Sequence, residues 1–196
     1  MEPIRRSEIK DLAGYEKVRA EIRRRAIEQR AARRVGLGKR LSAVFESREA
    51  LAYQIQEALR ARRTVDEGEI EREIDAVNEL LPRAGTLAAT LFVEFADGEP
   101  FSEPPVELGD LRERGGVSIE VGGATRVAAR AGGDPAAGAP SFGPVRLSFA
   151  FTAEAAASFR DASLPAALVV ELRGYGATAD LSPAVRTALA GDLGEV

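Results

Sequence analysis

The residues best suited to chemistry in this sequence are carboxylates and arginines, because the chain of 196 residues contains no histidine and no cysteine. That absence excludes a Ser-His-Asp triad, thiol nucleophiles, disulfides and metals ligated by histidine or cysteine. Carboxylates, Arg, Lys, Tyr, hydroxyl groups and the backbone remain. We therefore predict no cofactor and no metal site, and any metal would be a hard cation held by oxygen.

One hypothesis is an enzyme that uses carboxylates and arginines on a small anionic substrate. It predicts a concave pocket that gathers five side chains, Glu46, Arg48, Gln54, Glu57 and Glu94. The competing interpretation is that the carboxylates nearest the predicted core form separate ion pairs. Those carboxylates are Glu46, Glu57, Glu73 and Glu94, and the arginines available to them include Arg33, Arg34, Arg48 and Arg60. The same four carboxylates could instead hold a dimetal centre, but such centres normally also use histidine, so we favour the ion pairs over a metal centre.

The distribution of charge suggests a surface for a partner. Residues 1–64 hold 17 Lys or Arg and 9 Asp or Glu, a net charge of +8, and residues 65–196 carry −12. This split indicates either a basic surface for an acidic partner or two halves that attract each other. The predicted partner-binding residues are Arg23, Arg24, Arg30, Arg34, Tyr53, Glu57 and Arg60.

Nucleic-acid binding through the arginine-rich first helix is a further alternative, because clustered cations contact phosphates. Aromatic residues make up only 6% of the chain and the whole protein is acidic, with a net charge of −4, so we weigh against it. Gly36-Leu37-Gly38-Lys39-Arg40 is not a phosphate-binding loop. It lacks the upstream glycine and the Ser or Thr that follows the lysine.

Helical periodicity dominates the first part of the chain. We predict a basic helix over residues 15–34, ended by the glycines of Val35-Gly36-Leu37-Gly38. A half-buried strand over residues 41–46 follows, and Ser47 caps a helix over residues 48–63. Thr64-Val65-Asp66-Glu67 has the form of a capping box for a third helix, which Pro82 and Gly85 close.

From Thr86 the period changes to that of strands. We predict strands over residues 86–95, 117–121, 125–130, 145–151 and 167–173, with a Gly122-Gly123 hairpin turn. Thr152 and Ser182 cap two short helices. The predicted fold is α+β, with N-terminal helices packed on one face of a mostly antiparallel sheet. We predict a single domain over residues 1–196, helical over about 1–84 and β-rich over about 85–196, with a mobile loop over about 131–144.

The apolar stretches are too short to span a bilayer, and the N-terminus has no apolar region of a signal peptide. We therefore expect a cytoplasmic protein.

A family resemblance rests on several motifs in order along the chain. They are Arg33-Arg34-Val35-x-Leu37-Gly38, Phe45-Glu46-x-Arg48, Tyr53-Gln54-Ile55-Gln56-Glu57-x-Leu59-Arg60, Asn78-x-Leu80-Leu81-Pro82 and Leu87-x-Ala89-Thr90-Leu91-x-x-Glu94. With them, nearly the whole chain resembles the bacterial family called domain of unknown function 3501. Family members are often encoded beside rubrerythrin-like proteins and iron–sulfur oxidoreductases. The resemblance thus implies an accessory role in redox or peroxide defence.

The sequence departs from the family pattern at two late positions. The family often has histidine where this chain has Arg146 and Arg173. Any site that those histidines form in relatives is changed here, although the two arginines could share one surface patch. Our leading hypothesis is therefore a non-catalytic accessory protein, partnered by a rubrerythrin-like or iron–sulfur protein. It would use the basic first helix and an exposed face of Tyr53, Glu57 and Arg60.

Overall fold

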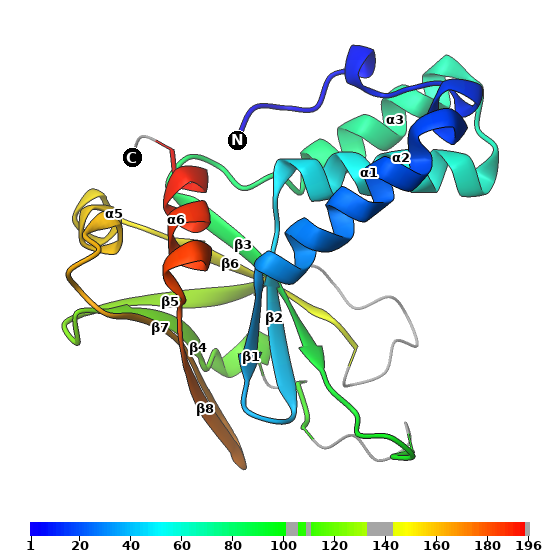
Figure 1. Cartoon of the computed structure of the whole chain (residues 1–196). Coiled ribbons are helices and arrows are strands. Elements are labelled where there is room, and N and C mark those ends of the chain that lie inside the picture. Colours follow the sequence, from blue (N-terminus) through cyan, green and yellow to red (C-terminus); the bar gives the residue numbers. More distant parts are fainter. Residues whose placement is uncertain (101–105, 109–110, 133–142, 195–196) are drawn as a thin grey trace.

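The structure is a computed structural model that describes residues 1–100, 106–108, 111–132 and 143–194. Three N-terminal helices stand at one end of a curved sheet, and two C-terminal helices pack beside it (Figure 1). The helical elements are the short 3₁₀ turn η1 (Arg6–Glu8), α1 (Leu12–Ala32), α2 (Arg48–Arg62), α3 (Glu67–Asn78), α4 (Leu111–Arg114), α5 (Ala153–Arg160) and α6 (Pro183–Asp192). The predicted α+β class is confirmed.

In the described part of the chain, eight strands form one antiparallel sheet in the order β1-β2-β3-β6-β5-β4-β7-β8. The strands are β1 (Arg34–Leu37), β2 (Leu41–Phe45), β3 (Thr86–Val93), β4 (Val117–Val121), β5 (Thr125–Gly132), β6 (Val145–Ala150), β7 (Ala166–Leu172) and β8 (Tyr175–Asp180). The sheet curls until its edge strands β1 and β8 approach each other, which makes a nearly closed barrel. At this seam the Tyr175 hydroxyl donates to the Leu37 carbonyl, and the Arg40 amide donates to Tyr175 Oη.

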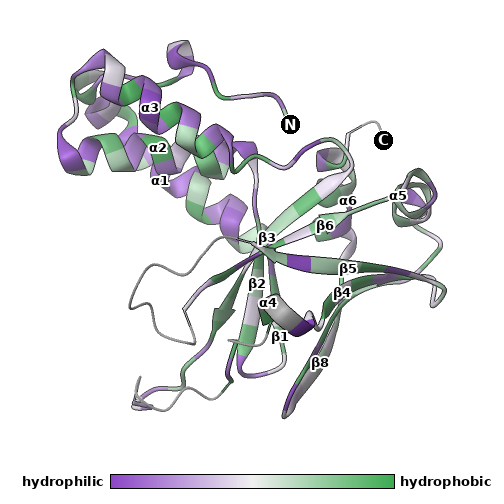
Figure 2. Cartoon of the chain, turned by 180° about the vertical axis from the view of Figure 1, so that it is seen from behind, coloured by the Kyte–Doolittle hydropathy of each residue, from purple (hydrophilic) through white to green (hydrophobic). Residues whose placement is uncertain are grey.

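The inner face of the sheet holds the larger hydrophobic core. Strand β3 shows the pattern, because Leu87, Ala89 and Leu91 point inward and are at most 2% exposed. Helices α5 and α6 add Phe159 and Leu189 to the same cluster. Figure 2 shows the resulting contrast between the apolar strands and the largely hydrophilic N-terminal helices.

The N-terminal helices have a second core of their own. Its members come from the helix stripes and the first residues of the chain: Ile4, Ile9, Leu51, Ile55, Leu59, Ile70, Ile74 and Val77. Two side-chain amides hold the N-terminal segment on this core. Asn78 exchanges hydrogen bonds of 2.8 and 3.0 Å with the backbone of Ile4, and Gln56 exchanges two of 2.9 Å with Lys10.

Polar bridges join the helices to the sheet. Arg33 forms an ion pair with Asp192 of α6, and Arg146 of β6 donates to the Leu80 carbonyl at 2.5 Å. The Gly85 amide also donates to the Leu193 carbonyl at 2.8 Å. These contacts fix the end of α1 to α6, and the segment after α3 to β6 and the end of α6.

Several local predictions are confirmed. Ser47, Thr152 and Ser182 each accept a backbone hydrogen bond at the start of a helix, and Pro183 is the first residue of α6. Strand β4 has the predicted bounds, and Gly122-Gly123 forms its hairpin turn with positive φ at both glycines. These are positions at which neighbouring residues alone decide the conformation.

The prediction that residues 35–38 end the first helix was wrong. Helix α1 ends at Ala32, and residues 34–37 form edge strand β1. Val35 and Leu37 are buried in the core while Arg34 and Gly36 are exposed, so the segment has the period of a strand. The left-handed residue is Gly38, with φ of 67°, in the turn between β1 and β2.

Strand β2 differs from the predicted half-buried strand, because all five of its residues are buried. Its inner side faces the core, and the helices cover its outer side at Val44. The predicted capping box was also wrong. Asp66, not Thr64, caps α3, by accepting from the Glu69 amide at 2.9 Å.

Three further differences concern element bounds. Helix α3 ends at Asn78, before the predicted stop at Pro82. Strand β8, rich in Gly, Ala and Thr, was not predicted. Of the predicted loop over residues 131–144, residues 131–132 belong to β5 and residues 133–142 lie outside the described part of the chain. The arrangement of the helices also differs from the prediction that they cover one face of the sheet, since α2 and α3 pack chiefly in their own core.

None of the helices in the described part of the chain has both the length and the apolar character needed to span a membrane.

Candidate functional site

Helix α1 is held by very little packing, since Tyr15 is the one buried residue among its 21. The side turned to solvent neutralises its own charges. Arg24 pairs with Glu21 and Glu28, and Arg25 pairs with Glu21, at N···O distances of 2.7–2.8 Å. Such pairs three or four residues apart stabilise a polar helix. The other side of α1 faces α2 and the sheet.

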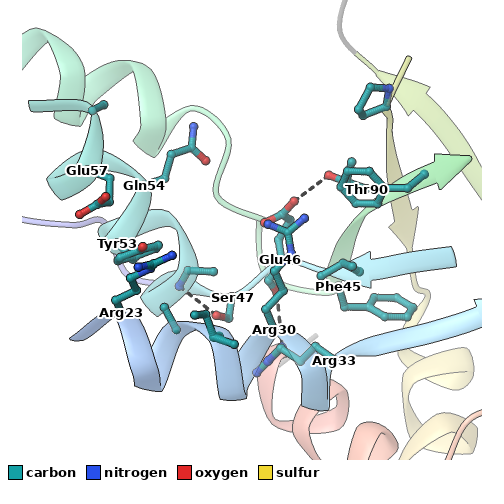
Figure 3. A pocket seen from close by; sticks show the side chains of 17 residues that line it. Arg23, Arg30, Arg33, Phe45, Glu46, Ser47, Tyr53, Gln54, Glu57 and Thr90 are labelled. Carbon is teal, nitrogen blue, oxygen red and sulfur yellow. Dashed lines mark hydrogen bonds between the residues drawn. The ribbon is translucent and has the colours of Figure 1, made fainter. Parts of the chain in front are cut away.

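Between α1, α2 and the outer side of β2 and β3 lies a cavity of about 870 Å³, which we call the α1–α2 groove. Figure 3 shows side chains of all four elements around this space. Much of its lining is apolar: Ala26, Ile27, Val44, Phe45, Ala50, Ala58 and Phe92. Ile27 is 57% exposed, which is unusual for a large aliphatic side chain.

A hydrogen-bonded triad closes the end of the groove where α1 contacts α2. Glu57 accepts from the Tyr15 hydroxyl at 2.7 Å and from two nitrogens of Arg19 at 2.8 Å. The Arg19 hydrogen bonds, aided by that of Tyr15 and opposed by burial, lower the pKa of Glu57 to about 2. Burial and the Glu57 carboxylate both raise the pKa of Tyr15 above its ordinary value. The triad is therefore a fixed, fully satisfied anchor.

Arg33 closes the opposite end of the groove. Its guanidinium pairs with Asp192 and donates to the Glu46 carbonyl at 3.3 Å. The Arg33 and Asp192 side chains are 14% and 17% exposed, so this pair is largely shielded from water. Arg33 thus positions α1 on the sheet, and its charge is already neutralised.

Two other guanidiniums of the groove have no such partner. Arg23 forms no ion pair or hydrogen bond with any residue that the structure describes. Arg30 lies over the Phe92 ring, 5.4 Å from its centroid, and has no ion pair within the described residues. Both arginines lie seven residues apart on α1, which is two helical turns and therefore the same side.

The sheet and α2 contribute the remaining polar groups. Glu46 accepts from the Thr90 hydroxyl at 2.7 Å and, among described residues, forms no ion pair (Figure 3). The side chains of Tyr53 and Gln54 line the groove without a hydrogen bond to the described part of the chain. The groove therefore presents two unneutralised cations, one unneutralised carboxylate and an apolar lining.

The structure brings together three of the five candidate catalytic residues. Glu46, Gln54 and Glu57 line the groove. Arg48 lies elsewhere, where it pairs with Glu8 at 2.6 Å and donates to the carbonyls of the N-terminal segment. Glu94 also lies outside, where it accepts from Arg34 and Ser42 at 2.5 Å. The ion pairs that we favoured form at Glu57, Glu94 and Glu73. Glu73 pairs with Arg62 at 2.8 Å. Among the described residues, Glu46 forms no ion pair.

The predicted partner-binding residues divide in the same way. Arg23, Arg30, Tyr53 and Glu57 line the groove. Arg24 and Arg34 are neutralised by ion pairs. The expectation of an exposed face at Tyr53, Glu57 and Arg60 is corrected. Helix α1 covers it, with Glu57 bound to Arg19 and Arg60 bound to Glu16 at 2.5 Å.

The two late arginines have separate environments. Arg146 is half-buried on β6 and donates to the Leu80 carbonyl. Arg173 is exposed in the turn between β7 and β8. No group of three or more Asp or Glu within the described residues is arranged to hold a metal ion.

Sequence reasoning missed several groove residues. In the sequence, Thr90 was named only within a family motif, and no role was predicted for Phe92 or Ile27. The sequence signal for Thr90 was its spacing of two residues from Phe92, which places both side chains on the same side of a strand. In the structure, both residues pair with outward-facing residues of β2. The Arg19–Glu57 pair gave no sequence signal, because it joins residues 38 positions apart.

The fold and the groove define a class of α+β protein in which a nearly closed antiparallel barrel carries an N-terminal helical unit. The chain belongs to the family described as "Protein of unknown function (DUF3501)", which it matches over residues 3–193. It is also similar to a crystal structure described as a novel protein of unknown function from Burkholderia pseudomallei. The identity is 28% and the TM-score 0.84, over 98% of this chain and 100% of the other. Among curated proteins, no relative matches the chain.

Proposed function

We propose that this protein is an accessory binding protein and that the α1–α2 groove is its binding site for an anionic ligand with an apolar part. The observation that carries the proposal is the presence of Arg23 and Arg30, two guanidiniums without counter-charges among the described residues, beside an apolar lining. Clustered arginines favour carboxylate and phosphate groups, because the planar guanidinium donates two parallel hydrogen bonds.

The motifs behind the family resemblance support the same site. Of their polar residues, Glu46, Tyr53, Gln54 and Thr90 face the groove, and Glu57 anchors its closed end. Gln56 and Asn78 instead hold the N-terminal segment, and Arg48 pairs with Glu8. A hydrogen bond or ion pair thus accounts for these motif residues outside the groove, whereas Tyr53 and Gln54 form neither within the described residues.

Binding fits this arrangement better than catalysis. Glu57 is held ionised by Arg19, so it is a poor proton donor or acceptor at neutral pH. Arg33 is neutralised by Asp192, and Arg48 and Glu94 lie outside the groove. The balanced charges on the solvent side of α1 also favour a small anion over nucleic acid, which needs an extended row of free cations.

Titration with the fluorescent amphipathic anion anilinonaphthalenesulfonate tests the proposal. The native protein should bind it with a blue-shifted emission. The double variant Arg23→Gln/Arg30→Gln should bind about tenfold more weakly or worse, because two charge-assisted contacts are lost.

The matched control is Arg24→Gln/Arg25→Gln, which makes the same charge change on the solvent side of α1. This control should bind the probe like the native protein. Equal weakening in both variants would mean that net charge rather than the groove governs binding, and the proposal would fail.

We propose in addition that the protein works beside a redox partner, either a rubrerythrin-like protein or an iron–sulfur oxidoreductase, in peroxide defence. The family resemblance alone supports this step. Co-purification from the native host, with each candidate identified by mass spectrometry, tests it. A chain that repeatedly purifies without either partner counts against the step but leaves the groove proposal intact.

A further inference from the structure

We infer that the ligand of the α1–α2 groove is a small aromatic carboxylate that also carries a hydrogen-bond donor, an inference that rests on the proposed function. Three features of the groove specify these three parts of the ligand. They are the free arginines of α1, the aromatic lining near Phe92, and the carboxylate of Glu46.

The arginines specify the anion. Arg23 and Arg30 approach the groove from the same side of α1, about 10 Å apart along the helix axis. Both side chains line the groove beside the exposed Ile27, so either guanidinium is available to a carboxylate bound there. The ligand's carboxylate would supply the counter-charge that the described residues do not.

The lining specifies a flat apolar body. The guanidinium of Arg30 already lies over the Phe92 ring at 5.4 Å, and Val44 and Ala50 line the same space. Flat aromatic rings pack favourably on both guanidinium planes and aromatic faces. A volume of about 870 Å³ lies within the range of small-molecule sites, about 300–1,000 Å³.

Glu46 specifies the donor. Thr90 donates to its Oε1, and Oε2 accepts no hydrogen bond from the described residues. Arg33 donates to the backbone carbonyl of Glu46, but its guanidinium forms an ion pair with Asp192 and not with the Glu46 carboxylate. A half-buried carboxylate in a cationic groove is thus left with a free acceptor, which an N–H or O–H group of the ligand would satisfy.

Calorimetric titration with three related compounds tests this inference. Indolepropionate has the carboxylate, the aromatic body and a ring N–H donor. Naphthaleneacetate lacks the donor, and tryptamine lacks the carboxylate. We expect indolepropionate to bind about tenfold more tightly than naphthaleneacetate, the effect of a hydrogen bond to a charged acceptor, and tryptamine to bind the most weakly.

The variant Glu46→Ala identifies the acceptor. It keeps the backbone hydrogen bonds of this residue and removes only the carboxylate. In this variant the affinity for indolepropionate should fall to that for naphthaleneacetate, whose own affinity should not fall. The control Glu49→Ala removes an exposed carboxylate of α2 outside the groove and should change neither affinity.

The two proposals fail in different ways. Equal affinity of the native protein for indolepropionate and naphthaleneacetate, with both lost in Arg23→Gln/Arg30→Gln, would overturn the donor inference and keep the anion site. If the binding of indolepropionate and naphthaleneacetate does not depend on the two arginines, both the donor inference and the proposed function are wrong. Thermal melts of every variant confirm that each compared protein is folded.

Discussion

At the scale of single residues, Glu57 decides how α1 meets α2. The sequence placed this residue on an outward face of α2, yet its carboxylate accepts hydrogen bonds from Tyr15 and Arg19 of α1. Tyr15 is the one buried residue of α1, so this triad and the Glu16–Arg60 ion pair supply the polar contacts between the two helices that the structure describes.

The pKa of Glu57 predicts a pH-dependent contribution to stability. Its pKa is about 2 in the folded protein, below the ordinary value of 4.5, so the unfolded chain binds the proton more readily. The contribution, about 1–2 kcal/mol after allowance for solvent screening, is complete above about pH 5 and is lost as the pH falls toward 2. Glu57→Gln should therefore destabilise the protein at neutral pH, and the difference from the native protein should shrink on acidification.

Urea unfolding measured across this pH range gives the comparison. Glu79→Gln, which changes an exposed carboxylate that has no ion pair within the described residues, is the control and should show no such trend. A constant difference between Glu57→Gln and the native protein at every pH would rule out the linkage.

Two glutamines near each other in sequence differ in what they hold. Gln56 is 5% exposed and bonds both backbone groups of Lys10, whereas Gln54 faces the groove with no hydrogen bond among the described residues. Gln56→Ala should lower the free energy of unfolding by about 1–3 kcal/mol, because it leaves the two partly buried backbone groups of Lys10 unpaired. Gln54→Ala should change it by less than about 0.5 kcal/mol.

Chemical denaturation of both variants gives the comparison, and limited proteolysis should cut the N-terminal segment faster in Gln56→Ala. If the two substitutions cost the same, the amide of Gln56 does not hold this segment.

At the scale of elements, local signals located the starts of α2, α5 and α6. They misplaced the start of α1, which begins at Leu12 and not at residue 15, and the start of α3. The sequence around residue 64 offered two side chains that could cap α3, Thr64 and Asp66. The turn after α2 decided between them: Arg63 adopts φ of 53°, and the helix then begins at Glu67. Asp66 is the residue left at the cap.

Alanine substitutions separate the two candidates. Asp66→Ala should lower stability by about 1 kcal/mol, the usual effect of removing a cap. Thr64→Ala should change stability by no more than a few tenths of a kcal/mol, since Thr64 makes no cap contact. Thermal unfolding followed by circular dichroism measures both, and the reverse order of effects would restore the predicted capping box.

At the scale of the whole molecule, the side chain of Tyr175 bridges the seam of the barrel. Tyr175 of β8 donates to the Leu37 carbonyl, and Arg40 donates to the same hydroxyl. This contact spans 138 positions in sequence and joins the two edge strands. An edge strand without such a contact exposes unpaired backbone groups.

Tyr175→Phe keeps the ring and removes the hydroxyl. We expect a loss of about 1 kcal/mol in the free energy of unfolding and faster amide hydrogen exchange in β1 and β8. Exchange in β3 and β6, at the centre of the sheet, should be unchanged. Faster exchange throughout the sheet would instead indicate global destabilisation and would contradict a local role at the seam.

The sequence by itself determined the α+β class, six strands, three helix caps and the residue types left for chemistry. These features follow from periods of 2 and 3.6 and from short-range hydrogen bonds, which neighbouring residues fix without help from the rest of the chain. It also singled out Arg23, Arg30, Glu46, Tyr53 and Gln54 as candidates, because charge and exposure can be read from residue types.

Only the tertiary structure decided which candidates remain available. Arg24, Arg34, Arg48, Arg60 and Glu94 were equally plausible in sequence, and each is committed to an ion pair. Most of these partners lie about 40 positions away or more, so local patterns carry no information about them. Strand β1 and the seam at Tyr175 were hidden for the same reason, since burial on a curved sheet depends on strands distant in sequence. The groove exists because α1 and α2 meet at Glu57 and diverge over the sheet, an angle that no single segment specifies.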